Sequence, residues 1–202
     1  MSVLSSQRVL LALALALASL LVGLAFFWQP ENPAALPAPA TARPAPGGDF
    51  TLESAAGPVS LRDYRGKAVL LSFGYTSCPD ICPTALATIA SGLQQLRPEE
   101  AGRAAAIFVS VDPQRDSPKR LKEYVAFFHP ALVGVTGTPE AVAATAGLYG
   151  AFYARQGADT AGGYVVDHTA DIYVFDPAGR LAGRIPHGTA PSQVAAEIRR
   201  HL

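Results

Sequence analysis

The sequence contains very little sulfur. Its 202 residues include two cysteines and one methionine, and the methionine is Met1. Two cysteines are too few for a disulfide framework, so the fold must be held together by a hydrophobic core. Half of the residues are hydrophobic, which is enough to build one. Because Met1 stands at the terminus, no thioether ligand is available to a metal in the rest of the chain.

Excess charge of either sign is also absent. Lysine and arginine together number 16, and so do aspartate and glutamate. We find no basic stripe, no acidic tail and no internal repeat, so the sequence predicts no nucleic-acid partner and no repeat architecture. The length suits one ordinary domain with an extension.

The extension begins with an apolar run over residues 9–28, VLLALALALASLLVGLAFFW. A helix needs about 20 such residues to cross a bilayer. Arg8 precedes the run and Glu31 follows it, which predicts a cytoplasmic segment over residues 1–8 and export of the remainder. The alternative is a cleaved signal peptide, but its apolar core would be only about 7–15 residues long. A retained transmembrane helix is therefore favoured.

A linker follows the apolar run. Residues 29–48 are rich in proline and alanine, which is typical of a stiff, extended spacer. The folded domain is expected over residues 49–202. Its predicted location is the periplasmic side of a bacterial plasma (inner) membrane. The mitochondrial inner membrane is the topological equivalent, although no Arg/Ser-rich transit segment precedes the run.

Within the domain, short apolar runs alternate with helical patterns. Ser117-Pro118 and Thr138-Pro139 each place a capping residue before a proline, which is typical of a helix start. The predicted elements are a hairpin near 50–64, strands over 68–75, 105–112 and 132–137, helices over 83–96, 117–128 and 138–153, a hairpin around 178–179 and a helix after 191. This alternation predicts an α/β fold with a central sheet flanked by helices. A β-α-β half followed by a β-β-α half is the thioredoxin-like arrangement.

Both cysteines lie in one short stretch, TSCPDICPT, four residues apart at Cys78 and Cys82. Pro79 and Pro83 each disfavour helical geometry in the cysteine before them. We therefore expect a turn from Cys78 to Cys82 and a helix that starts at Pro83. At the helix N-terminus the dipole would favour a thiolate and lower the pKa of Cys82.

Two neighbouring thiols can form a disulfide, exchange with another disulfide or bind a soft metal; they can also be ordinary buried cysteines. A thiol–disulfide oxidoreductase is one hypothesis, although thioredoxin-type enzymes use a Cys-x-x-Cys spacing. A peroxiredoxin-like peroxidase is another, because YTSCP resembles its Thr-x-x-Cys region. Thr76, however, precedes Cys78 by two residues rather than three.

A metal would need a further ligand. The histidines are His129, His168, His187 and His201. His168 lies between a glycine-rich segment and an apolar strand pattern, where a structural role is the commoner one. Two thiolates with an imidazole suit copper(I) or zinc. Structural zinc usually takes four protein ligands, and no third cysteine is present.

Three stretches together resemble the Sco/SenC family: GKAVLLSFGYTSCPDICPTAL, VSVDPQRDSP and VVDHTADIYVFDPAGRL, in this order after a single apolar run. The resemblance covers roughly residues 49–200. It implies a membrane-anchored, thioredoxin-fold copper chaperone that helps to assemble the copper centres of cytochrome c oxidase. It also implies that Cys78, Cys82 and His168 bind copper, as Cu(I) or Cu(II), and that the cysteines form a redox-active pair.

The same resemblance suggests supporting roles for Asp80, Asp112 and Asp167 beside the ligands. The alternatives are a solvated turn residue for Asp80 and a capping carboxylate for Asp112. The implied partners are the copper-receiving subunit of cytochrome c oxidase and a thioredoxin-like reductant. A metal carrier is favoured over an enzyme, with reduction of the receiving subunit's cysteines as the alternative function. The glycine-rich loop 157–163 would let His168 swing.

Overall fold

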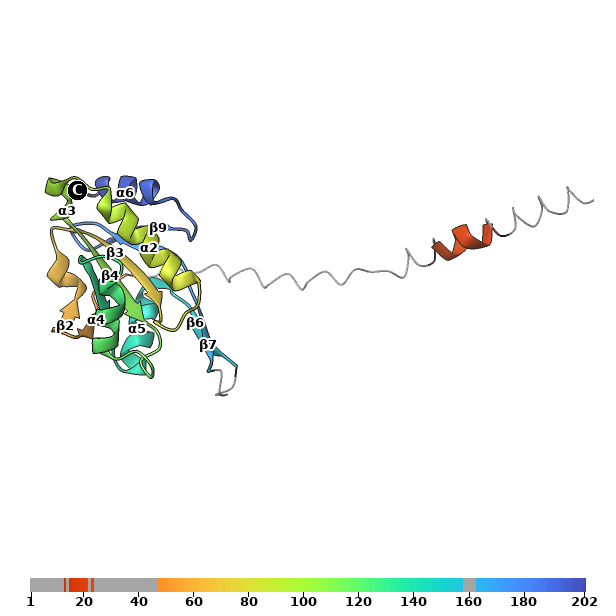
Figure 1. Ribbon diagram of the computed structural model, residues 1–202, viewed down its shortest axis with the longest axis horizontal. Helices are drawn as coiled ribbons and strands as arrows, with labels where there is room; N and C mark the ends of the chain where they lie inside the picture. Colours follow the sequence, from red (N-terminus) through yellow and green to blue (C-terminus); the bar gives the residue numbers. More distant parts are fainter. Residues whose placement is uncertain (1–12, 14, 22, 24–46, 158–162) are drawn as a thin grey trace, which may run out of the picture. The chain divides into compact units, whose positions relative to one another are not determined.

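The computed structural model describes residues 13, 15–21, 23, 47–157 and 163–202 (Figure 1). The chain divides into two units, Met1–Arg43 and Pro44–Leu202. The described residues of the first unit are helical. Within the described part of the chain, no helix combines the length and the apolar character needed to cross a bilayer. Most of the expected anchor and almost all of the linker lie outside the described residues, so these assignments stay predictions.

A five-stranded mixed sheet forms the centre of the second unit, in the order β5-β4-β3-β8-β9. Its strands are β3 (Ala68–Gly74), β4 (Ala104–Ser110), β5 (Leu132–Val135), β8 (Ile172–Phe175) and β9 (Leu181–Ile185). β3, β4 and β5 run parallel, whereas β8 and β9 are antiparallel to their neighbours. Every residue of β3 and β4 is buried, as expected for strands covered on both faces. The predicted α/β arrangement is confirmed.

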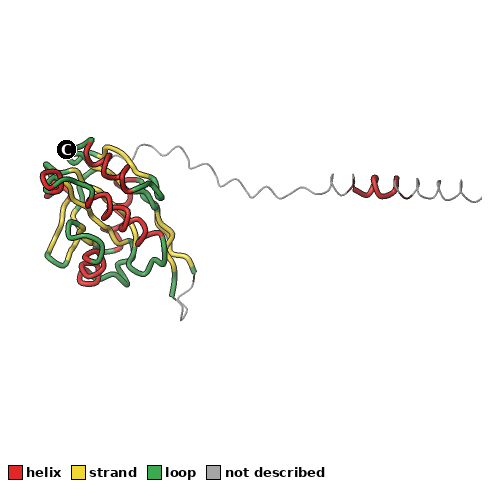
Figure 2. The backbone as a smooth tube through the Cα atoms, turned by 45° about the horizontal axis from the view of Figure 1, so that its top comes forward, coloured by secondary structure: helices red, strands yellow, loops and turns green. Residues whose placement is uncertain are grey.

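Helices cover both faces of this sheet (Figure 2). They are α2 (Ile81–Gln94), α3 (Pro98–Ala101), α4 (Pro118–Ala126), α5 (Pro139–Tyr149) and α6 (Pro191–Arg199). Buried residues of α2, α4 and α6 share one core cluster. Buried residues of α5 share the other with the N-terminal hairpin, β1 (Thr51–Ser54) and β2 (Gly57–Ser60), and with the 3-10 turn η1 (Leu61–Tyr64) that follows it.

The helix starts follow the local signals in the sequence. The Ser117 hydroxyl accepts a hydrogen bond from the Arg120 N–H, and Thr138 caps α5 in the same way, each with proline at the first helical position. The end of α5 differs from the prediction, since the helix stops at Tyr149. Gly150 takes a left-handed conformation there, with φ 62°, and ends the helix.

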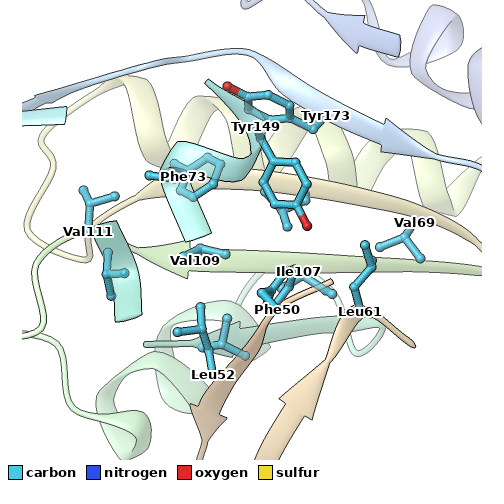
Figure 3. Packing of buried hydrophobic residues seen from close by; sticks show 14 of the residues in the cluster. Phe50, Leu52, Leu61, Val69, Phe73, Ile107, Val109, Val111, Tyr149 and Tyr173 are labelled. Atoms are coloured by element: carbon cyan, nitrogen blue, oxygen red, sulfur yellow. The ribbon is translucent and has the colours of Figure 1, made fainter. Parts of the chain in front are cut away.

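Aromatic rings fill the core between the sheet and α5. Figure 3 shows Phe73, Tyr149 and Tyr173 side by side in this layer. The Phe73 and Tyr173 rings meet edge to face, with centroids 5.6 Å apart. The Tyr149 hydroxyl donates to the Gly48 carbonyl at 2.7 Å, so its polar end is satisfied although the ring is buried. Burying one such ring stabilises the fold by roughly 1.5–3 kcal/mol.

The hairpin formed by β6 and β7 was not predicted. β6 (Tyr153–Gln156) and β7 (Val165–His168) pair antiparallel as a separate two-stranded sheet. Most of their side chains are exposed or half-buried, so the sequence carries no alternating apolar pattern there. Residues 158–162, which include most of the loop expected to let His168 swing, lie outside the described residues.

Candidate metal centre

The segment that carries both cysteines leaves β3 after Gly74 and enters α2. The helix begins at Ile81, two residues before the predicted start at Pro83. Pro83 is the third residue of the helix, where backbone N–H groups have no intrahelical partner, so its missing N–H loses no hydrogen bond. Cys82 is therefore helical, and its side chain points into the core.

The two thiols differ in their surroundings. Cys82 is only 2 % exposed, whereas Cys78 is half-buried. The Cys82 N–H, in the first turn of α2, points to the Cys78 sulfur at 3.4 Å, so this helix-terminal N–H contacts Cys78. Burial raises the pKa of the Cys82 thiol. The prediction of a lowered pKa was wrong, because the lost hydration of a thiolate outweighs the hydrogen bond from the Tyr75 backbone that would lower the pKa.

Space for the Cys82 sulfur comes from Gly74, at the end of β3. A Cβ atom at this position would lie 2.7 Å from the Cys82 sulfur and 2.7 Å from a Phe108 ring carbon. Any side chain would therefore displace one of them. Sequence reasoning missed Gly74; the available signal was a glycine at the end of an otherwise apolar strand.

His168 lies at the end of β7 and faces the cysteines. Its Nε2 is 3.1 Å from the Cys82 sulfur, and its Nδ1 is 3.0 Å from the Thr169 carbonyl oxygen. Because a carbonyl only accepts, Nδ1 is the nitrogen that donates, and Nε2 is the nitrogen that faces the thiols. The Tyr75 ring meets the imidazole edge to face at 6.0 Å. The imidazole is thus oriented as a ligand before any metal binds.

The sulfurs of Cys78 and Cys82 and a ring nitrogen of His168 all lie within 4.8 Å of one another. Among the described residues, these three form the one group of potential metal ligands that is compact enough to hold a single ion. Two soft sulfur donors and one imidazole nitrogen suit copper(I) or zinc, and the donor set fits a thiophilic ion. The fold therefore brings together the three residues implied by the resemblance.

The three aspartates occupy different places. Asp80 is exposed at the start of α2, where its carboxylate accepts from the Thr84 hydroxyl at 3.4 Å. Asp167 is exposed on β7. Asp112 is only 4 % exposed and accepts from the Tyr164 hydroxyl at 2.7 Å. The compact group of ligand atoms includes none of the three.

The remaining histidines also lie outside this group. His129 follows α4, where its Nδ1 accepts from the Ala131 N–H at 3.1 Å and burial lowers its pKa. His187 is exposed beyond β9. His201 is half-buried and contacts the Glu197 carboxylate at 3.3 Å.

The fold and this site define a class: thioredoxin-like proteins with a thiol pair and an imidazole at the end of the central sheet. The SCO1/SenC family model matches residues 38–202, and the chain belongs to this family. The mitochondrial SCO2 homolog of Bos taurus is 36 % identical over 157 residues, which cover 77 % of this chain and 59 % of that protein. The SCO2-like protein of Rickettsia felis is 34 % identical over 150 residues, 73 % of each chain.

Solved structures agree with this membership. Bradyrhizobium japonicum ScoI with copper bound is 38 % identical, with a TM-score of 0.70, covering 77 % of this chain and 99 % of that one. The apo Sco1 protein of Thermus thermophilus is 40 % identical, with a TM-score of 0.72, covering 80 % and 94 %. The chain spans about three fifths of the mammalian SCO2 homologs that it matches.

Proposed function

We propose that this protein is a copper carrier that binds the metal through Cys78, Cys82 and His168 and delivers it during assembly of cytochrome c oxidase. One observation carries the proposal: residues 86 positions apart in the sequence place a sulfur and an imidazole nitrogen 3.1 Å apart, with the second sulfur in the same cluster. Family membership and copper-bound relatives support copper as the metal.

The unequal burial of the thiols suits a carrier. Both thiols must lose a proton to bind copper, and the raised pKa of Cys82 means that the incoming metal displaces that proton. Copper(I) accepts two or three ligands, so a three-ligand site holds it without closing every approach. A ligand of the receiving protein would reach the metal from the side of the site where Cys78 is half-buried.

A second function shares the same residues. The two sulfurs lie within 4.8 Å of each other, and both cysteines are free in this structure. A dithiol of this kind can reduce a disulfide in the copper-receiving subunit, forming its own Cys78–Cys82 disulfide as it does so. A thioredoxin-like reductant would then restore the thiols.

The sequence also supports a location for the copper-binding domain. The proposed arrangement has a cytoplasmic segment over residues 1–8, a retained anchor over 9–28, a spacer over 29–48 and the copper-binding domain over 49–202 in the periplasm. The apolar run and its flanking charges support this arrangement. It would place the site on the side of the membrane where the copper-receiving subunit is expected.

The test compares the full chain with Cys78→Ser, Cys82→Ser and His168→Ala, each reduced without oxygen, loaded with copper(I) and desalted. About one copper per wild-type chain is expected, lost in both cysteine variants and weakened in His168→Ala. His129→Ala is the matched control and should bind like the wild type, because His129 lies outside the site. Little copper in the wild type, together with a readily exchanged Cys78–Cys82 disulfide, would sink the carrier and leave the oxidoreductase.

A further inference from the structure

The loop that follows β4, residues 112–116 with the sequence DPQRD, lies between the two halves of the proposed site. Its last residue, Asp116, is fully buried. The Asp116 carboxylate accepts from the Thr76 N–H at 2.9 Å, the Thr76 hydroxyl at 2.5 Å and the Ser110 hydroxyl at 2.7 Å. A buried carboxylate without such bonds would be very costly, so these contacts hold Thr76 firmly, two residues before Cys78.

The first part of the loop contacts the other half of the site. Asp112 accepts from the Tyr164 hydroxyl at 2.7 Å and is ion-paired with Arg115. The Arg115 guanidinium also donates to the Tyr164 carbonyl oxygen at 2.9 Å and stacks 3.7 Å from the centroid of the Tyr164 ring. Tyr164 immediately precedes β7, the strand that ends at His168.

Tyr75 completes the connection between the halves. The Arg115 guanidinium lies 5.3 Å from the centroid of the Tyr75 ring. The Tyr75 hydroxyl accepts a hydrogen bond from the Val166 N–H of β7 at 3.3 Å. The same ring meets the His168 imidazole edge to face. Arg115 therefore contacts aromatic rings from both the cysteine segment and the histidine hairpin.

These side chains matter because, among the described strands, β6 and β7 pair only with each other, as a two-stranded sheet separate from the central one. An isolated two-stranded hairpin is marginally stable in water, so its position depends on side-chain contacts. Cys82, in contrast, lies within α2, whereas three residues separate His168 from β8 of the central sheet. Nothing in the backbone pairing alone would keep the imidazole at a set distance from the thiols.

We propose that loop 112–116 sets the distance between the thiol pair and the imidazole. Asp116 is the positioning residue for the cysteine segment, and Arg115, held by Asp112, is the positioning residue for the hairpin that carries His168. The proposal rests on the proposed function for its copper readouts, but the geometry that it describes exists without metal.

The test uses the full chain carrying copper(II), with electron paramagnetic resonance to detect imidazole nitrogen coupling. Arg115→Met should lose that coupling, as His168→Ala does, and should bind copper about 10–100-fold more weakly, the usual loss when a ligand's support is removed. Tyr164→Phe, which removes only the hydroxyl bonded to Asp112, should show a smaller loss in the same direction. Arg115→Lys should fall between wild type and Arg115→Met, because lysine restores the charge but not the stacked planar fork.

Asp116→Asn tests the contacts that position the cysteine segment. It should change the rate at which iodoacetamide alkylates Cys78 and the reduction potential of the Cys78–Cys82 pair, while nitrogen coupling from His168 remains. The matched control is Asp176→Asn, because Asp176 pairs with Arg180 as Asp116 pairs with Arg120 at 3.7 Å, but lies in the β8–β9 turn. The control should leave every readout at the wild-type value.

Folding is checked by far-ultraviolet circular dichroism and thermal melting. If Arg115→Met does not fold, Tyr164→Phe and Arg115→Lys are measured in its place. The proposal is overturned if the folded Arg115 and Tyr164 variants keep the wild-type nitrogen coupling and copper affinity. It is also overturned if the Arg115, Tyr164 and Asp116 variants all change the nitrogen coupling and the cysteine reactivity to the same extent. If the wild type binds no copper, the proposed function fails separately. The ring-proton chemical shifts of His168 in the metal-free protein then decide: they should move in Arg115→Met and stay in Asp176→Asn, and unmoved shifts would overturn the proposal.

Discussion

The parallel pair β3–β4 has buried carboxylates near each end: Asp112 and Asp116 at the end that carries the cysteines, and Glu100 at the other. Asp116 and Glu100 have different partners. At the end that carries the cysteines, Asp116 accepts from a backbone N–H and two hydroxyls. At the opposite end, Glu100 accepts from the Arg97 N–H at 2.9 Å and from the guanidinium groups of Arg97 and Arg199.

The partners explain what each end does. Arg199 belongs to α6, and its guanidinium also donates to the Gln95 carbonyl oxygen beyond α2 at 2.6 Å, so the Glu100 cluster joins helices at the surface. The hydrogen bonds to Asp116 come from Thr76 and Ser110, which hold a loop in one conformation, while the Arg120 guanidinium lies farther away, at 3.7 Å. One end therefore supports stability and the other supports the geometry of the site, although both rely on a buried carboxylate.

The largest expected effect is the pH dependence of copper affinity at the end that carries the cysteines. Burial holds the pKa of the Cys82 thiol above its ordinary value of 9.0, so copper(I) must displace a proton from Cys82 throughout pH 5–8. Copper affinity should fall about tenfold per pH unit for each proton displaced as the pH drops. Competition with a copper(I) chelator of known pH dependence measures the slope. An affinity that does not change between pH 8 and pH 5 would contradict the protonated thiol.

Two glycine substitutions compare the ends sterically. Gly74→Ala would push a Cβ atom to 2.7 Å from the Cys82 sulfur, whereas a Cβ at Gly102 meets nothing within 4 Å. We expect Gly74→Ala to lower the free energy of unfolding by about 1–3 kcal/mol and to weaken copper binding. Gly102→Ala should stay within about 0.5 kcal/mol of wild type and keep its copper. Urea denaturation and copper per chain measure both effects; equal behaviour of the two variants would refute the steric account.

The smallest effect is expected from Glu100→Gln at the stability end. The Arg97 N–H, followed by the Arg97 guanidinium, lowers the pKa of Glu100 from its ordinary value of 4.5 to about 2. A lowered pKa stabilises the fold above about pH 4.5, and this contribution is lost as the pH falls toward about 2. Glu100→Gln should therefore unfold at lower urea than wild type at pH 7 while binding the same copper.

Repeating the urea titrations at lower pH checks the sign of this effect. The difference between wild type and Glu100→Gln should be constant between pH 8 and pH 5, where copper affinity is expected to change most. It should shrink below about pH 4.5, as the carboxylate in the unfolded chain becomes protonated. A difference that persists undiminished at pH 3 would argue against the lowered pKa.

Much of the fold could be predicted because its signals are local. The caps at Ser117 and Thr138 start their helices as predicted, and the buried strands are predominantly apolar runs. The β6–β7 hairpin could not be predicted, because its exposed side chains leave no periodic pattern. The direction of the Cys82 pKa shift was missed for a related reason: desolvation depends on what packs over a thiol, and sequence neighbours do not reveal that.

The sequence by itself determined that both thiols share one turn, that no thioether ligand is available beyond Met1 and that strands alternate with helices. These are properties of neighbouring residues and of composition. The resemblance to the Sco/SenC family already implied His168, but only the tertiary structure decided how its imidazole reaches the thiols, because the Tyr153–His168 pairing in β6–β7 and the contacts of Arg115 join segments that are not adjacent in the sequence. It likewise decided that Gly74 makes room for sulfur and that Asp116 holds the cysteine segment, since contacts between distant segments form only when the chain folds.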